Sequence, residues 1–171
     1  RQLQCRRGER CSVRDGDRAD LPSGLQDHTG YWLNRLRGIV HARFETALAE
    51  YGVTVAQWSV LITVYREDAV TPLEIARFID VDPGSLTRLL DRMEDKDLIR
   101  RLPVDGDRRS IRIALTPHAA AMTPRLAALA DANDAAFFTG LPAGEIRDFR
   151  RALARLLRAQ GVEAPQAWED G

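Results

Sequence analysis

The sequence has few cysteines, and both lie close to its N-terminus. Cys5 and Cys11 are the only two in 171 residues, and no second pair or adjacent histidine accompanies them. Because a structural zinc site needs four ligands and a disulfide-built fold needs several pairs, we expect neither. The three histidines also lack metal-ligand spacing, so we predict no metal and no cofactor. A redox role for the two thiols stays open, since neighbouring arginines lower a thiol pKa.

Long hydrophobic runs are missing as well. No segment approaches the ~20 apolar residues that span a bilayer, and the polar N-terminal stretch has no apolar core of the kind found in secretory signals. We therefore predict a cytoplasmic protein without membrane contact. We also expect residues 1–26 to form a flexible polar arm.

The chain has no excess of either charge, with 25 basic and 25 acidic residues. Composition alone thus gives no support for nucleic-acid binding, which must rest on where the charges lie. Of the basic residues only Lys96 is a lysine. Arginine is the better bidentate ligand for phosphate and guanine, but a GC-rich coding bias explains the same skew.

Four segments begin with residues that favour helix starts. Thr54 with Gln57, and Thr71 with Glu74, match the capping box, while Asp82-Pro83 and Thr116-Pro117 pair a capping side chain with a proline for the first turn. Hydrophobic periodicity then predicts helices over about 29–51, 55–66, 72–79, 83–96, 117–139 and 142–159.

Between the fourth and fifth helices the period changes to that of strands. Residues 98–102 and 110–115 predict a hairpin around a loop at 103–109, with Ile111, Ile113 and Leu115 on one face. Over 100–112 there are five arginines and two aspartates, a local charge of +3 in a neutral chain. An arginine at such a tip can enter the minor groove of DNA. A solvated turn is the alternative.

The helix at 83–96 is a candidate recognition helix, since a three-residue link joins it to the helix before. Leu86, Leu89, Leu90 and Met93 recur at helical spacing and predict its buried stripe. The opposite face begins with small polar residues and one arginine, which suits an approach to base edges. Asp91 and Asp95 argue mildly against DNA, although they could hold arginines in position.

Several stretches resemble the MarR family of winged-helix transcription regulators: residues 54–61, 71–76, 86–100, 107–109 and 115–117. The resemblance implies a mainly α fold with a small β-hairpin: a winged helix-turn-helix domain at 53–116, a dimerisation helix at 27–52, C-terminal dimerisation helices at 117–160 and a loose tail at 161–171. It also implies a homodimer on a pseudo-palindromic operator. Asp97 stands where the family commonly has glycine, so its backbone should be left-handed.

By the same resemblance, the fourth helix enters the major groove, Arg109 is the minor-groove arginine of the wing, and Asp107 is its salt-bridge partner. The predicted DNA contacts are Thr71, Ser85, Thr87, Arg88, Arg92, Asp107, Arg108 and Arg109. Many such regulators respond to small phenolic or aromatic acids, and the predicted effector-binding residues are Trp32, His41, Trp58, Tyr65 and Arg66.

We therefore predict a DNA-binding transcription regulator, a repressor released by a small aromatic or phenolic ligand. A winged helix that binds only proteins is the alternative, and it should expose more aromatic residues. No phosphate loop, carboxylate pair or nucleophile elbow suggests an enzyme.

Overall fold

The computed structural model describes residues 22–104 and 107–168, and for residues 107–109 it describes the backbone alone. Most of the predicted N-terminal arm, residues 105–106 of the predicted loop and the last three residues lie outside the described residues. The chain divides between Gly38 and Ile39 into two compact units, which we describe separately.

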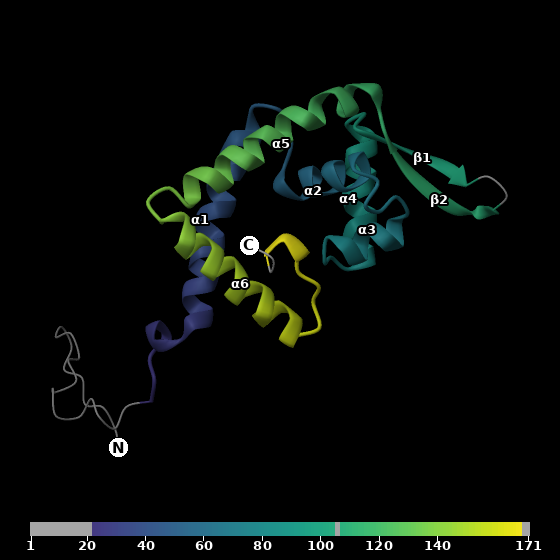
Figure 1. Cartoon of the computed structure of the whole chain (residues 1–171). Helices are drawn as coiled ribbons and strands as arrows, with labels where there is room; N and C mark the ends of the chain where they lie inside the picture. The colour runs from purple at the N-terminus through teal and green to yellow at the C-terminus, as the bar shows by residue number, and fades with distance from the viewer. Residues whose placement is uncertain (1–21, 105–106, 169–171) are drawn as a thin grey trace, which may run out of the picture. The chain divides into compact units, whose positions relative to one another are not determined.

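The fold is mainly α-helical with one antiparallel hairpin, as the sequence predicts (Figure 1). Its elements are η2 (Leu25–Asp27), α1 (Thr29–Ala49), α2 (Val55–Tyr65), α3 (Pro72–Phe78), α4 (Pro83–Asp95), β1 (Ile99–Val104), β2 (Asp107–Leu115), α5 (Pro117–Phe137), α6 (Ala143–Ala159) and η3 (Gln166–Trp168). Both η helices are single 3₁₀ turns.

The four predicted helix starts are confirmed. Thr54 Oγ1 accepts the Gln57 N–H at 3.2 Å while Gln57 Oε1 accepts the Thr54 N–H at 3.1 Å, and Thr71 forms the same reciprocal box with Glu74. The α4 and α5 starts have side-chain caps from Asp82 and Thr116. These bonds satisfy N–H groups that would lack a partner in the first turn of each helix.

In the second unit, one hydrophobic core joins α2, α3 and α4 to the base of the hairpin and to α5. The predicted stripe of α4 is buried as expected, with Leu86, Leu90 and Met93 at most 1% exposed. Around it pack fully buried side chains from other elements: Leu48, Val60, Leu61, Ile75, Ile99, Ile113 and Leu126. The core therefore holds α4 by one face and leaves its polar face outward.

The hairpin is longer than predicted. Residues 103–104 and 107–109, which we expected in the loop, belong to the strands, with Pro103 opposite Ile111 and an irregularity between Pro103 and Val104. Since each strand has one partner, Pro103 can leave its missing N–H on the open edge without breaking a ladder bond. Figure 1 shows the hairpin projecting beyond the helices.

This projection changes the expected burial of the hairpin. Ile113 is fully buried, and its N–H donates to Val70 O at 2.8 Å. Ile111 is 44% exposed, although it lies two residues from Ile113 and was predicted on the same face of the strand. The hairpin is thus anchored at its base only, as a wing.

Among the described residues, three that are not glycine adopt positive φ, and Asp97 is one of them at 56°. This confirms the left-handed backbone predicted there. The turn places Leu98 N–H on Met93 O at 2.9 Å and leads directly from α4 into β1. Recognition helix and wing are therefore joined by one tight turn.

After the wing, α5 packs against α2 and is followed by α6. Asp134 at the end of α5 pairs with Arg150 of α6 at 3.2 Å, and the Phe138 and Phe149 rings lie 6.0 Å apart. Within the predicted tail, η3 places Trp168 beneath the Arg150 guanidinium at 5.9 Å. None of the described helices combines the length and hydropathy of a membrane span.

The first unit contains η2 and the start of α1. Trp32 Nε1 donates to Gln26 O at 2.8 Å, and the Tyr31 and Trp32 rings meet edge to face at 5.1 Å. Arg35 lies about equally close to both rings and donates to the Tyr31 hydroxyl at 3.2 Å. The 3₁₀ turn η2 spans residue 26, where the sequence predicted the end of the flexible arm.

Candidate nucleic-acid interface

The N-terminus of α4 is a compact polar surface. Asp82 Oδ1 accepts the Ser85 N–H at 2.9 Å, and Ser85 Oγ accepts from Arg88 Nη2 at 3.1 Å. Hydrogen bonding from the Ser85 side chain, then from its backbone N–H, holds the pKa of Asp82 below its usual value. Asp82 is therefore a stable anion at neutral pH, and Arg88 is held near the start of the helix.

The remaining predicted contacts on this surface are also outward-facing or half-buried. Thr87 Oγ1 donates its proton to Pro83 O at 2.9 Å, so it presents a methyl group and oxygen lone pairs. Thr71 accepts the Glu74 N–H at 3.4 Å as a cap, and its own N–H donates to Glu74 Oε2 at 3.0 Å. Arg92 is exposed, and neither it nor Arg88 pairs with a carboxylate among the described residues.

Arg101 connects the wing to α4. Its Nη1 lies 2.6 Å from Glu94 Oε2 and its Nη2 lies 2.6 Å from Asp91 Oδ1. The Arg101 N–H also donates to Glu94 at 3.3 Å. Charge-assisted bonds of this length are strong for side-chain contacts. They fix the first wing strand on the polar side of the recognition helix.

These contacts correct the charge balance read from the sequence. Arg100 pairs with Asp97, Arg101 with the two α4 carboxylates, and Arg112 with Glu67 at 3.6 Å. Three of the five arginines counted over 100–112 are thus neutralised in space by acids that lie outside that window. Of the two α4 aspartates that argued mildly against DNA, Asp91 is used to hold the wing, together with Glu94.

The predicted wing-tip contacts of Asp107, Arg108 and Arg109 concern side chains outside the described residues. The backbone places these three residues at the start of β2, next to the tip of the projecting hairpin.

A separate cavity of about 540 Å³ lies between α1, α2 and α5 in the second unit. Two of the predicted effector-binding residues line it, Trp58 and Arg66. The Phe44 ring meets Trp58 edge to face at 4.9 Å. Its remaining lining residues are Ile62, Ala127, Ala130, Asp131, Asn133 and Asp134.

The other predicted effector-binding residues lie elsewhere. His41 and Tyr65 are exposed and are not among the described residues that line this cavity. Trp32 belongs to the first unit, where it is 50% exposed. The sequence reading missed the α5 side of the cavity, although three polar residues at 131, 133 and 134 interrupt an alanine-rich helix there.

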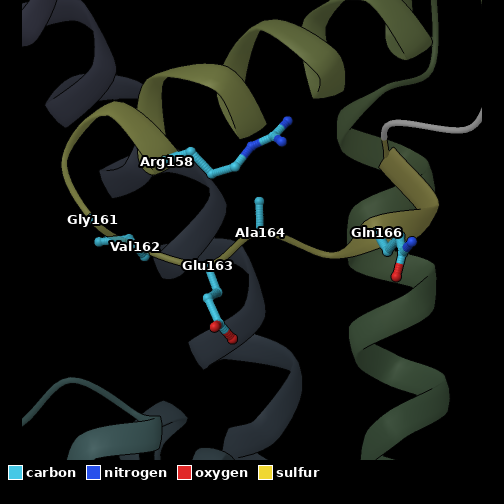
Figure 2. A pocket seen from close by; sticks show the side chains of 6 residues that line it. All are labelled: Arg158, Gly161, Val162, Glu163, Ala164 and Gln166. Atoms are coloured by element: carbon cyan, nitrogen blue, oxygen red, sulfur yellow. The ribbon is translucent and has the colours of Figure 1, made fainter.

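A second hollow, of about 520 Å³, is lined by one local segment around the end of α6 (Figure 2). Figure 2 shows the Glu163 side chain extending away from that of Arg158. This hollow is lined by none of the predicted site residues, and its described lining comes entirely from residues 158–166.

Comparison with known proteins agrees with this geometry. The MarR family model matches residues 53–111. The multiple antibiotic resistance protein MarR of Escherichia coli is 36% identical over 94 residues, which cover 53% of this chain and 65% of that protein. The sequence match thus spans slightly less than two thirds of that relative.

Two solved structures extend the similarity to most of the chain. A cysteine-to-serine mutant of E. coli MarR in complex with operator DNA is 28% identical with a TM-score of 0.69, covering 75% of this chain and 92% of that one. CouR from Rhodococcus jostii bound to p-coumaroyl-CoA is 26% identical with a TM-score of 0.67, covering 79% and 95%. Residues 53–111 therefore match the MarR family, and the fold of most of the chain is similar to that of solved MarR winged-helix regulators.

Proposed function

We propose that this protein is a repressor that binds a pseudo-palindromic operator as a homodimer and is released by a small aromatic ligand. The observation that carries the proposal is the polar face of α4, where Arg88 and Arg92 form no salt bridge among the described residues and the Asp82 charge attracts Arg88. The wing is fixed beside that face by Arg101. In this cytoplasmic role, a bound dimer would exclude other proteins from the promoter.

On DNA, the start of α4 enters the major groove and the wing reaches the minor groove. Residues near the N-terminus of a recognition helix contact base edges, which assigns base reading to Ser85, Thr87 and Arg88. Arg92, one turn further on, meets phosphate, as do Thr71 and Arg108. Arg109 enters the minor groove with Asp107 orienting it. The E. coli relative was solved in complex with operator DNA, which supports DNA binding by this fold.

The homodimer is supported by exposed apolar side chains outside the DNA-binding part. On α6, Phe149 is 38% and Leu156 is 62% exposed, and their spacing of seven residues places them on one face. In the first unit, Leu33 is 45% and Leu36 is 36% exposed on successive turns of α1. A two-fold dimer would set its recognition helices about 34 Å apart, one turn of DNA. Leu156→Glu should therefore reduce the mass measured by light scattering.

The effector site is the cavity between α1, α2 and α5. Its aromatic wall of Phe44 and Trp58 suits a planar ligand. CouR was solved with a bound aromatic thioester, which supports ligand binding by this fold.

One observation favours the alternative, a winged helix that binds another protein. Leu73 is 53% and Phe78 is 58% exposed on α3. Exposed aromatic surface of this kind is typical of protein interfaces. Against it, the polar face of α4 offers hydrogen-bonding groups and unpaired arginines rather than an apolar patch.

DNA titration decides between the two. Duplex fragments from the region upstream of the gene should bind with sub-micromolar affinity at low salt, and binding should weaken steeply as salt rises. A scrambled duplex of the same length is the control. Absent or salt-insensitive binding to every upstream fragment would overturn the DNA proposal and favour the protein-binding alternative.

A further inference from the structure

We propose that the ligand of the α1–α2–α5 cavity is an aromatic cation, with Asp131 as its charge partner. The inference rests on the proposed effector site and adds the charge of its ligand. It follows from the kind and pairing of the charged groups that line this cavity.

Carboxylates outnumber cations in the lining. Asp131 and Asp134 come from one side, and Arg66 is the single basic residue among the described lining residues. Asp134 is already paired with Arg150 at 3.2 Å. Asp131 is exposed at the cavity and has no hydrogen-bond or ion-pair partner among the described residues, so its charge is available to an occupant.

Arg66 is a poor anchor for an anionic ligand. Its Nε donates to Asp68 Oδ2 at 3.1 Å, and its side chain is 65% exposed. Because this guanidinium is already paired with Asp68, it offers a ligand carboxylate little further attraction. The same carboxylate would meet Asp131 and Asp134 across the cavity.

A neighbouring cavity, lined partly by α6, shares Asp131 and Asp134 and adds Arg147 and Arg150. Arg150 is committed to Asp134 and lies over the Phe138 ring at 5.5 Å. Arg147 is exposed, and among the described residues it forms no ion pair with Asp131. The α6 arginines therefore leave the Asp131 charge unpaired.

The aromatic wall of the cavity also favours a cation, because an aromatic ring attracts positive charge to its face. The face of an indole ring attracts an organic cation more strongly than any other side-chain ring. Trp58 is only partly buried, so it can present surface to an occupant. Electrostatic complementarity and ring attraction thus favour the same class of ligand, a planar aromatic amine.

Three isosteric probes test the proposal with the full chain: 2-naphthylmethylammonium, 2-naphthoate and 2-naphthylmethanol. Calorimetric titration should show the cation binding roughly tenfold more tightly than the anion, with the alcohol between them. Asp131→Asn should remove most of this preference while leaving the alcohol affinity unchanged. Glu50→Gln, which removes an exposed carboxylate after α1, should leave all three affinities unchanged.

Equal or tighter binding of naphthoate would overturn the proposal, and so would failure of all three probes at millimolar concentration. A charge preference that survives in Asp131→Asn would exclude Asp131 as its source. DNA titration of the same samples separates these outcomes from failure of the regulator function. Operator binding with no cation preference would overturn the ligand class alone.

Discussion

Arg101 Nη2 in β1 lies 2.6 Å from Asp91 Oδ1 in α4, so the wing and the recognition helix share an ion pair across ten residues of sequence. Glu94 completes the contact from the next turn of α4. The three side chains are only partly exposed, at 27% for Arg101, 55% for Asp91 and 36% for Glu94. The contact therefore determines how two DNA-reading elements are placed relative to each other.

Arg101→Met should weaken both folding and DNA binding. Methionine keeps the apolar part of the side chain, so the change isolates the ion pairs, worth about 0.5–1.5 kcal/mol of unfolding free energy in a partly exposed setting. DNA affinity should fall several-fold because the wing is no longer held on α4. Urea unfolding and fluorescence anisotropy measure the two effects.

Arg125→Met on α5 is the matched control, since Arg125 is exposed and distant in sequence from both elements. It should alter neither quantity. If Arg101→Met lowers the stability of the protein but leaves its DNA affinity unchanged, the ion pairs of Arg101 serve folding alone.

Arg88 and Arg92 should differ in the kind of DNA affinity they provide. Arg88 is oriented by Ser85 near the helix start, so Arg88→Ala should cost about 1–3 kcal/mol on the operator and relax its sequence preference. Arg92→Ala should weaken operator and scrambled duplex alike and lower the salt slope by about one. Equal losses on both duplexes for Arg88→Ala would make it a phosphate contact.

Arg109→Ala should lower operator affinity by about 1–3 kcal/mol if this arginine enters the minor groove. Arg108→Ala is the natural control, because it removes the same charge one residue away and should give a smaller loss that disappears at high salt. Anisotropy at two salt concentrations measures both. A loss of only a few tenths of a kcal/mol for Arg109→Ala would favour the solvated turn.

Local signals explain why much of the fold could be predicted from the sequence. The caps at Thr54, Thr71, Asp82 and Thr116 depend on residues within one helical turn, and all four form as expected. The Asp97 backbone is likewise a property of one position. Helical and strand periodicity requires no knowledge of tertiary contacts.

Contacts between distant residues could not be predicted in this way. A charge count over a window cannot register Glu67 or Glu94, which neutralise wing arginines from other elements. Similarly, the cavity is completed by α5 residues that lie some seventy positions after Trp58. The resemblance and the residue types suggested Trp58 and Arg66 on one wall of this cavity, and only the packing of α5 on α2 supplies the other.

Thr116 should contribute more to the stability of the fold than is usual for a polar residue, because it is buried and fully hydrogen-bonded. It is 3% exposed, its Oγ1 accepts the Ala119 N–H at 3.2 Å, and its hydroxyl proton goes to Asp97 O at 2.7 Å. Thr116→Val keeps the shape but removes a cap worth about 1 kcal/mol and a buried hydrogen bond of similar size. Urea unfolding should therefore show a loss of about 2 kcal/mol.

Thr123→Val provides the comparison, since Thr123 is fully buried but its hydroxyl only donates to Ala119 O within the same helix, at 2.8 Å. That carbonyl keeps its helical partner, so the loss should be clearly smaller. Equal losses in the two variants would mean that the hydrogen bonds of Thr116 to Asp97 and Ala119 add nothing to stability.

Acid should weaken the starts of α3 and α4 together. The Thr71 N–H, followed by the Thr71 hydroxyl, lowers the pKa of Glu74, and Ser85 lowers that of Asp82. A carboxylate whose folded-state pKa is depressed stabilises the fold above its unfolded pKa, about 4 for both residue types. This contribution is lost as pH falls through the lower, folded-state value.

Asp82→Asn separates the charge from the cap, because asparagine caps a helix about as well as aspartate but does not titrate. The urea midpoint of the wild-type protein should fall between pH 5 and pH 3, and the fall should be shallower in Asp82→Asn. At neutral pH the two proteins should unfold at similar urea concentrations, whereas Asp82→Ala should be weaker throughout. An equally steep acid dependence in Asp82→Asn would show that other carboxylates, and not this cap, govern the response to pH.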